Sequence, residues 1–417
     1  MHFLMRIAAV GLCMALFAGC SGVTPRSVSL GDSAPSDSMD MGGGSAAAKA
    51  LQVDDKRLEE IQFRSLWTNT QLKGMIAQAW FSGEDLYIVR SKTSGSGDNR
   101  KTSYDLLRVN GVTGIVDWSF ALSGKLEFAP TAYHYPAEMQ ESHPSELYIV
   151  QDDVVYCIDN RYGAENYRVD VGFPVSTSIA VSQDNFIVAS WNRRVYGFSK
   201  ASQLEAWTYI TDAVITATPV IGGLDVYVGS EDNNLYALNV GAGWVEGKSW
   251  KQATGGKIVS RPLYYSDRVY FGSWDYKVYC RDSYKGLLRW GYPAQAPITQ
   301  PVGLFREWVF AITTTEHRAD RSWRLLALDR SEGKKRWERS DIREILAADP
   351  FHCFAMDGSR TLHALRLEDG VGSWSLDMSN FDFVLGQDAD QGRARERLGR
   401  MFLISKKGLI QAIEPRR

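Results

Sequence analysis

The sequence predicts an all-β fold, an eight-bladed β-propeller closed by a strand from the N-terminal part of the chain. Three observations lead to this prediction. Strand-like runs recur about every 40 residues, a motif of Asp, Gly and Trp follows most of them, and the last repeat lacks the outer strand that the others have. One such sheet cannot bury both of its faces alone, whereas a closed ring of sheets can.

The strand-like runs are rich in β-branched and aromatic residues, which favour pleated, buried strands. They begin at Leu86, Leu147, Phe186, Val226, Val269, Val309, His352 and Met401. From Leu147 onward, neighbouring starts are 39, 40, 43, 40, 43 and 49 residues apart. A polar turn such as residues 231–234 (EDNN) then reverses the chain into a second strand, LYALN. Each repeat is therefore expected to form one small antiparallel sheet.

The motif is clearest at residues 327–337 (ALDRSEGKKRW), which contain Asp329, Gly333 and Trp337. A second good copy contains Asp282, Gly286 and Trp290. The Asp is expected to accept hydrogen bonds from backbone amides of the turn, and the Gly to adopt positive φ. The Trp would begin the outer strand and bury its ring against the next blade. Partial copies give the same structural role to Trp67, Trp118, Trp207, Trp250 and Trp374, and place Tyr167 in the Trp position of another repeat.

The repeats number eight, and the chain supplies a strand to close them. Their approximate bounds are 72–122, 123–171, 172–211, 212–252, 253–292, 293–339, 340–377 and 378–417. The last repeat stops at residues 414–417, where its Gly and Trp should follow. The missing outer strand is present near the other end of the chain, in residues 61–67, which end on Trp67. We therefore predict that this strand completes the last blade and removes the open sheet edges.

Insertions are expected on both faces of the ring. Loops between second and third strands are long at residues 91–103 and 313–322, and loops between first and second strands at residues 133–145 and 387–399. Strand alternation puts the two pairs on opposite faces, and the second pair shares its face with the entry of the N-terminal segment. Insertions in repeat proteins often mark a binding face. A basic run in the last insertion is interpreted as a solvated loop or as a patch for an acidic partner: Arg393, Arg395, Arg397 and Arg400.

The N-terminal residues have the pattern of a targeting segment. Arg6 precedes an apolar run, and residues 17–20 (FAGC) resemble a bacterial lipobox. The resemblance implies a signal peptide over 1–19 and acylation of Cys20; the alternative is an ordinary signal peptide cut nearby. Residues 20–60 are expected to be a lipidated cysteine and flexible tether before a propeller over 61–417, although residues 53–61 could form a short helix. No later apolar run approaches membrane-spanning length. Ser21 after the lipid site would place the protein in the outer membrane of a Gram-negative cell, facing the periplasm.

Composition excludes one class of partner and offers no reactive site. A chain of 417 residues with a formal net charge of −2 has no basic field for nucleic acid. Three cysteines, Cys157, Cys280 and Cys353, are expected to be free and buried, because the first two occupy the same position in blades that are not neighbours. The histidines His134, His143, His317, His352 and His363 show no metal-ligand spacing. The acids Asp152, Asp153, Asp232 and Asp275 are expected to form hairpin turns.

The repeats resemble those of pyrroloquinoline-quinone (PQQ) enzymes and their non-enzymatic relatives. With the lipobox, eight units and N-terminal closure, the chain resembles the BamB-type lipoproteins of the outer-membrane β-barrel assembly machine. This resemblance implies a monomeric, membrane-anchored scaffold that binds protein partners and has neither cofactor nor catalytic activity. The enzymes of this repeat class carry adjacent cysteines and a Ca²⁺ site, and neither is recognisable here. The alternative is a propeller that binds PQQ or another ligand, as an enzyme or a sensor.

Overall fold

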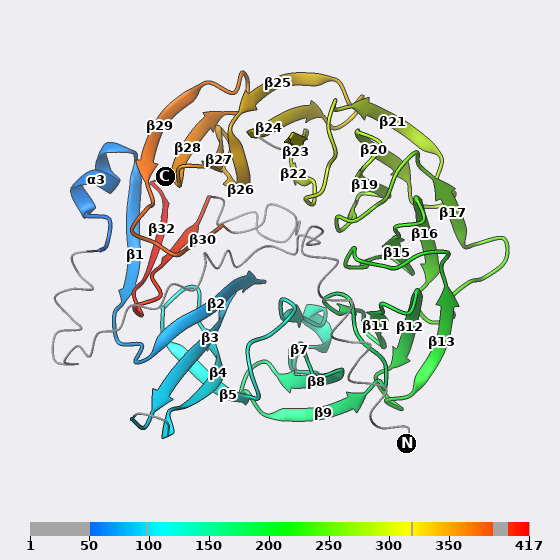
Figure 1. The fold of residues 1–417 in the computed structure, drawn as a ribbon, viewed down its shortest axis with the longest axis horizontal. Helices are drawn as coiled ribbons and strands as arrows, with labels where there is room; N and C mark the ends of the chain where they lie inside the picture. The colour runs from blue at the N-terminus through cyan, green and yellow to red at the C-terminus, as the bar shows by residue number, and fades with distance from the viewer. Residues whose placement is uncertain (1–50, 97–98, 318–319, 387–398, 417) are drawn as a thin grey trace.

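A computed structural model describes residues 51–96, 99–317, 320–386 and 399–416, without the side chains of 316–321. Its strands form eight separate antiparallel sheets of four strands each, arranged in a ring (Figure 1). The fold class predicted from the sequence, an eight-bladed propeller, is therefore confirmed. No helix within the described residues is long and apolar enough to span a membrane.

The strands of the first four blades follow the chain without interruption. Blade 1 contains β2 (Met75–Ser82), β3 (Asp85–Ser94), β4 (Lys101–Val109) and β5 (Val116–Leu122); blade 2 contains β6 (Thr131–Tyr133), β7 (Glu146–Gln151), β8 (Val154–Asp159) and β9 (Glu165–Asp170). Blade 3 contains β10 (Ala180–Val181), β11 (Asn185–Ala189), β12 (Arg194–Ser199) and β13 (Glu205–Ile210); blade 4 contains β14 (Val220–Gly222), β15 (Asp225–Gly229), β16 (Asn234–Asn239) and β17 (Trp250–Ala253).

The remaining blades repeat this order, except that blade 8 takes its outer strand from the start of the chain. Blade 5 contains β18 (Leu263–Tyr265), β19 (Arg268–Ser273), β20 (Lys277–Asp282) and β21 (Leu288–Pro293); blade 6 contains β22 (Gly303–Phe305), β23 (Trp308–His317), β24 (Asp320–Asp329) and β25 (Lys335–Ser340). Blade 7 contains β26 (Ile342–Ala348), β27 (His352–Asp357), β28 (Thr361–Arg366) and β29 (Gly372–Asp377); blade 8 contains β30 (Phe383–Gly386), β31 (Met401–Ile404), β32 (Ile410–Pro415) and β1 (Phe63–Asn69).

The hairpin of blade 4 shows how the local sequence reverses the chain. Asp232 accepts a hydrogen bond from the amide of Asn234 at 3.0 Å, and Asn233 adopts a φ of 71°, which Asn tolerates better than most residues. The second carboxylate oxygen of Asp232 accepts a hydrogen bond from the amide of Asp212, in the segment that enters this blade. The acid therefore forms the turn, as predicted, and also fixes the connection from blade 3.

The hydrophobic core lies between blades. Buried side chains from one blade form a cluster with those of its neighbour; Ile187 and Val195 of blade 3, for example, share a cluster with Val226 and Leu238 of blade 4. Because successive strand residues point to opposite faces, each sheet supplies apolar residues to two such clusters. The ring is thus held by a series of similar interfaces.

Blade 8 joins the two ends of the folded chain. The N-terminal strand β1 pairs with the C-terminal strand β32, with Phe63 opposite Pro415 and Asn69 opposite Ile410. Figure 1 shows β1 (blue) lying beside β32 (red) in the same blade. The predicted closure by an N-terminal strand is therefore confirmed.

The packed part of the chain begins earlier than the predicted boundary at residue 61. Helix α3 (Asp55–Glu60) precedes β1, and its N-cap Asp54 accepts a hydrogen bond from the amide of Arg57 at 2.8 Å. Leu58 is fully buried in the core of blades 7 and 8. The buried amide of Gln411 exchanges two hydrogen bonds of 2.9 Å with the backbone of Val53. Of the two interpretations of residues 53–61, a short helix or a continuation of the tether, the structure therefore shows the helix, packed on the folded body.

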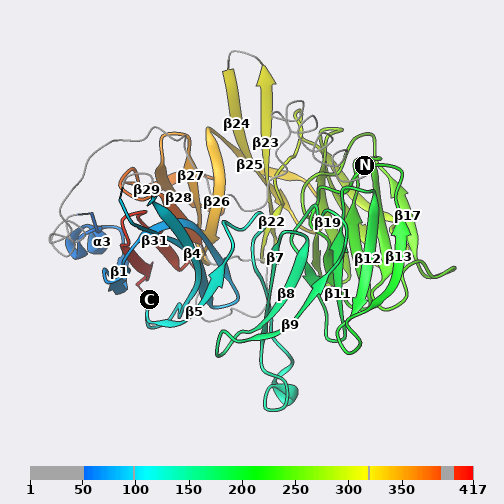
Figure 2. The same cartoon turned by 60° about the horizontal axis from the view of Figure 1, so that its bottom comes forward.

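Two predicted loops are paired strands instead. The β3–β4 ladder extends to Ser94 opposite Lys101, and the β23–β24 ladder extends to His317 opposite Asp320. Threonines and other β-favouring residues continue both hairpins beyond the core. The β23–β24 hairpin and the insertion between β6 and β7, which contains the 3₁₀ helix η2 (Ala137–Met139), project from opposite sides of the ring (Figure 2). The insertion at 387–399 lies almost wholly outside the described residues.

Candidate interaction surface

The turn between the third and fourth strands of blade 6 holds the clearest copy of the motif. Asp329 accepts hydrogen bonds from the amides of Ser331 at 2.9 Å and Glu332 at 3.0 Å. The Arg336 guanidinium, 2.6 Å away, is the main cause that holds the pKa of the Asp329 carboxyl well below its usual range. Gly333 has a φ of 71°, which glycine adopts without steric cost. The motif thus begins as a self-contained turn.

This turn receives the tryptophan of the preceding blade. The ring of Trp290, from blade 5, lies so close to Gly333 that an added Cβ would be 2.4 Å from it. The Trp290 indole N–H donates to the carbonyl of Arg330 at 2.9 Å. The Gly is therefore required twice, for its φ and for the approach of the ring.

Six of the tryptophans singled out in the sequence make this contact. Their indole N–H groups donate to a carbonyl in the next blade: Trp67 to Gly111 (3.2 Å), Trp118 to Asn160 (2.9 Å), Trp207 to Val240 (2.8 Å), Trp250 to Ser283 (2.9 Å), Trp290 to Arg330 (2.9 Å) and Trp337 to Leu367 (2.6 Å). The accepting residue always follows the Asp position of its motif. Asp282 and Gly286 stand in the blade 5 turn that receives Trp250.

Trp374 is placed differently. Its ring packs against Phe63, with centroids 5.4 Å apart, and against Phe354 at 5.8 Å. Blade 8 has no turn of this kind to receive it, because its outer strand, β1, is not connected to β32 by the chain. Aromatic packing replaces the indole hydrogen bond at this interface.

The interface between blades 2 and 3 replaces the motif by a buried polar cluster. Tyr167 stands in the Trp position. The ammonium of Lys200, in the blade 3 turn, donates a hydrogen bond to Glu146 of blade 2 at 2.7 Å. The two side chains are only 8% and 13% exposed. The Lys200 ammonium also lies 4.1 Å from the ring centroid of Tyr133 and 5.0 Å from that of Tyr135.

The electrostatics of this cluster follow from its burial. Burial lowers the pKa of the Lys200 amine, against the opposing effect of Glu146. The hydroxyls of Tyr135 and Tyr148 donate to the two oxygens of Glu146 at 3.0 and 2.9 Å. Tyr135 belongs to the blade 2 insertion, so the cluster fixes the base of that insertion. The cluster is not predicted from the sequence, although Tyr167 in a Trp position is a visible sign of it.

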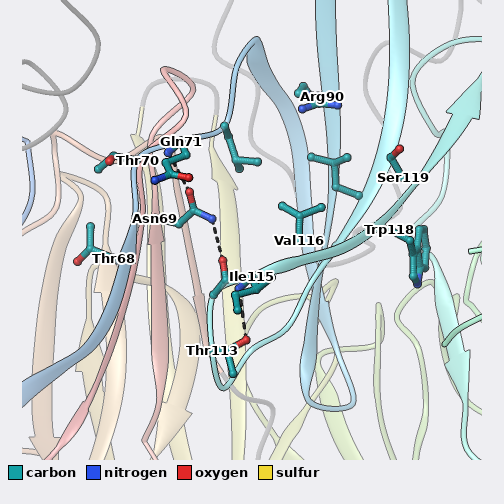
Figure 3. A pocket seen from close by; sticks show the side chains of 13 residues that line it. Thr68, Asn69, Thr70, Gln71, Arg90, Thr113, Ile115, Val116, Trp118 and Ser119 are labelled. Carbon is teal, nitrogen blue, oxygen red and sulfur yellow. Dashed lines mark hydrogen bonds between the residues drawn. The ribbon is translucent and has the colours of Figure 1, made fainter. Parts of the chain in front are cut away.

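A cleft of about 600 Å³ lies where blade 8 meets blade 1. Figure 3 shows its wall of hydroxyl and amide side chains, which include Thr68, Asn69, Gln71 and Thr113. Asn69 donates to the carbonyl of Gly114 at 2.7 Å and accepts from the amide of Gln71 at 2.9 Å. Its lining contains one cation and no Asp, Glu, His or Cys, so it offers hydrogen bonds rather than acid–base or nucleophilic chemistry.

The outer part of this interface has smaller side chains than the same part of the blade 3–4 interface. At the blade 3–4 interface the residue two after the Trp, Tyr209, packs on Tyr236 with centroids 5.6 Å apart. The corresponding pair at the blade 8–1 interface is Asn69 and Leu107. The smaller side chains leave the outer part of the interface open.

Arg400 corrects one sequence interpretation. The sequence places it with Arg393, Arg395 and Arg397 in a run interpreted as solvated or partner-binding, but only Arg400 is within the described residues. Arg400 is buried, pairs with Glu414 at 3.0 Å and donates to the carbonyl of Gly111 at 3.3 Å. It therefore ties β32 to blade 1 and is not available as a surface cation.

The histidines, for which the sequence shows no metal-ligand spacing, form no metal site in the part of the chain that the structure describes. Among the described residues, no group of three or more His, Cys, Asp or Glu side chains is placed to hold a metal ion. His363 hydrogen-bonds Asp357 at 2.9 Å, and His352 hydrogen-bonds Ser373 at 3.1 Å. Within this part of the chain, the His, Cys, Asp and Glu side chains therefore form no cluster of the kind that a Ca²⁺ ion beside PQQ would require.

The cysteines are placed as the repeat alignment predicts. Cys157, Cys280 and Cys353 are all free and buried. Burial raises the pKa of the Cys157 and Cys280 thiols to about 11. They pack as small apolar side chains and not as reactive thiols. Cys20, predicted to carry the lipid, lies outside the described residues.

Comparison with known families identifies the repeat. Residues 151–376, more than half of the chain, match the family described as outer membrane protein assembly factor BamB. The chain belongs to this family. Membership of the BamB family supports, in general terms, a role in protein–protein interaction and an association with the cell envelope. A search of the curated proteins finds no match.

Solved structures share the architecture. BamB from Moraxella catarrhalis is 14% identical, with 84% of this chain and 97% of that chain covered and a TM-score of 0.60. The computationally designed Ika8 protein is 10% identical, with 84% and 99% covered and a TM-score of 0.57. At such identities the similarity concerns the fold alone, and a designed protein can share it without a biological task.

Proposed function

We propose that this protein is a lipid-anchored propeller scaffold without catalytic activity, which binds other proteins at the bacterial cell envelope and takes part in outer-membrane protein assembly. The observation that carries the proposal is the BamB family match over residues 151–376. The use of the motif residues supports it, because six of the tryptophans and the turns that receive them are engaged in contacts between blades. The exposed turns and insertions are left for recognition.

The anchor is proposed from the sequence around Cys20. In the host bacterium, an alkyne-labelled fatty acid should be incorporated into the wild-type protein and not into the Cys20→Ser variant. The variant should also leave the membrane fraction. If both proteins are unlabelled and soluble, the anchoring part of the proposal is wrong, while the propeller is unaffected.

The assembly role is tested by crosslinking in cells. A photo-reactive amino acid is placed at exposed turn positions on both faces of the ring, one per variant, and crosslinked products are identified by mass spectrometry. We expect a barrel-assembly subunit at a contiguous set of positions. Failure to recover such a subunit from any position, at normal protein levels, would remove the specific role.

The absence of catalysis is also a proposal with a direct test. The purified protein is titrated with PQQ in the presence of Ca²⁺ and monitored by absorbance and by a dye-linked dehydrogenase assay. We expect no saturable binding and no rate above that of free PQQ. Stoichiometric binding with turnover would instead favour a quinoprotein enzyme.

A further inference from the structure

The turn of blade 5 between β20 and β21 exposes a compact apolar group. Tyr284, Leu287 and Leu288 are 72%, 59% and 55% exposed. They lie on the face that carries the turns between first and second and between third and fourth strands, which we call the tether face because α3 enters β1 there. Three large apolar side chains within five residues are unusual on a surface turn and indicate an interaction site.

The fold does not require these three side chains. Asp282 and Gly286 already build the turn, and Trp290 already docks on blade 6. In blade 6, the positions equivalent to Tyr284, Leu287 and Leu288 are Ser331, Lys334 and Lys335, and the same turn forms. An exposed apolar residue at the Leu287 position recurs in other blades, at Ile115, Leu204, Trp244 and Val371, so the feature particular to blade 5 is the group of three, which the blade 6 turn lacks.

The apolar group is surrounded by cations. On the tether face of blades 5 and 6, the turns 266–268, 282–289, 306–308 and 329–336 carry eight basic and five acidic residues, a formal net charge of +3. The equivalent turns of blade 7, 349–352 and 366–373, carry one basic and three acidic residues. The whole chain has a net charge of −2, so the positive charge is local to this sector.

Most of these cations are not neutralised by partners. Ion pairs engage Lys334 with Glu332, Lys335 with Glu338 and Arg336 with Asp329. The other five form no ion pair among the described residues: Arg268, Lys285, Arg289, Arg306 and Arg330. Contacts between the blades bring part of this set together, because Arg268 of blade 5 donates to the carbonyl of Arg330 of blade 6, the residue that also accepts from Trp290.

We propose that this blade 5–6 sector binds an acidic segment of a partner protein, with Tyr284, Leu287 and Leu288 as apolar anchors and Lys285 and Arg289 as charge partners. An apolar centre with a polar rim is typical of protein interfaces, and the positive charge of this rim is complementary to an acidic partner. The proposal rests on the proposed scaffold function and specifies one of its partners by chemistry.

A membrane surface is the less favoured occupant. The blade 2 insertion projects from the same face and carries Glu138 and Glu141 near its tip. Figure 2 shows this insertion extending well beyond the blades. An acidic projection would hold the face away from an anionic bilayer, whereas a flexible acidic peptide can reach blades 5 and 6 without meeting it.

The test uses the full chain and two labelled synthetic peptides of about twelve residues, one composed of Glu, Leu, Tyr and Gly and the other with Lys in place of Glu. Binding is measured by fluorescence anisotropy, and the contact region by hydrogen exchange. We expect the acidic peptide alone to bind, with protection at residues 283–289 and weaker binding as salt is raised. Charge reversal in Lys285→Glu/Arg289→Glu, or Leu287→Ser/Leu288→Ser, should weaken binding about tenfold or more.

Matched controls occupy the same turns of other blades. Leu204→Ser replaces the equivalent exposed leucine of blade 3, and Lys248→Glu reverses a cation in the blade 4 turn; neither should change binding. Equal binding of the basic peptide, protection outside this sector, no binding of the acidic peptide, or binding only to vesicles containing anionic lipid would overturn the proposal. The crosslinking test of the assembly role is separate, because a barrel-assembly subunit can be recovered from another surface while this site fails.

Discussion

At the residue scale, each member of the Asp–Gly–Trp motif meets one physical requirement. The Asp satisfies turn amides, the Gly permits a left-handed backbone beneath an aromatic ring, and the Trp buries apolar area while its N–H finds a carbonyl. Because Trp290 and Gly333 come from different blades, a substitution of either residue changes the packing of two sheets.

Removing a docking ring should be costly. Trp337 is buried in the core between blades 6 and 7 and donates to Leu367. Trp337→Ala should lower the free energy of unfolding by about 3–5 kcal/mol, because it leaves a large cavity and an unpaired carbonyl. Trp191→Ala, on an exposed hairpin of blade 3, is the control and should cost less than about 0.5 kcal/mol in the same denaturant experiment. A loss below about 1 kcal/mol for Trp337→Ala would contradict burial of this ring.

The steric part of docking can be separated from the backbone part. Gly333 and Gly172 have nearly the same positive φ, 71° and 70°, but only Gly333 lies against a ring. Each Ala substitution should lower the free energy of unfolding by about 1 kcal/mol, because Ala is disfavoured in the left-handed backbone conformation. Gly333→Ala should lose about 1–3 kcal/mol more, from overlap with Trp290. Equal losses, measured by urea unfolding, would mean that the ring moves aside without cost.

Asp357 should contribute to stability at acidic pH. Burial tends to raise the pKa of its carboxyl, but hydrogen bonds from His363 and the amides of Thr361 and Ser359 outweigh burial and lower it from 3.8 to about 2. A lowered pKa stabilises the fold above pH 3.8, and this contribution disappears as the pH falls towards about 2. Urea unfolding between pH 5 and pH 2 should therefore show a steeper loss for the wild type than for Asp357→Asn. Parallel curves would exclude this contribution.

At the scale of elements, interfaces between similar blades differ in chemistry. Five of the interfaces within the continuous chain use a docked Trp, and Trp67 of β1 makes the same contact on blade 1. The blade 2–3 interface instead uses the Lys200–Glu146 pair among tyrosines. A hydrophobic interface tolerates small adjustments, whereas a buried ion pair requires both partners.

Replacing one partner of this ion pair should destabilise blades 2 and 3 more than replacing both partners. Lys200→Met leaves Glu146 buried without its cation and should cost about 3–5 kcal/mol. The double variant Lys200→Met/Glu146→Leu should recover a substantial part of this loss, since no uncompensated charge remains. Equal stability of the single and double variants in thermal unfolding would show that Glu146 becomes hydrated in the single variant.

At the scale of the whole molecule, the ring is closed by pairing the two ends of the folded chain. The β1–β32 ladder runs from Phe63 to Asn69, and β1 also supplies Trp67 to the blade 1 interface. Closure therefore depends on a strand that is distant in sequence from the rest of its sheet. An open ring would expose the edge of β32 and part of the core of blade 8.

Truncation tests this closure. Deleting residues 61–70 should lower the melting temperature much more than deleting residues 24–50, because every blade has its four strands without residues 24–50. Deleting 51–60 should have an intermediate effect, since it removes buried Leu58 but leaves β1 in place. Equal melting temperatures for the first two truncations would contradict closure by β1.

Much of the architecture was predictable because repetition makes the local signals reinforce one another. A single Asp–Gly–Trp spacing is weak, but copies about every 40 residues predict equivalent positions in similar sheets. The blade 5–6 sector was less predictable from the sequence. Its apolar residues are exposed, so the periodic pattern of core positions in the sequence does not distinguish Leu287 from Leu204.

The sequence by itself determined the number of blades, the identity of six of the seven predicted docking tryptophans and the strand that closes the ring, because these depend on spacing and on alternation along the chain. Only the tertiary structure decided that Arg400 is buried between blades, that Lys200 reaches Glu146, and that residues from Val53 onward join the core. Each of these depends on which distant side chains meet across an interface. The periodicity of the sequence does not indicate which distant residues make these contacts.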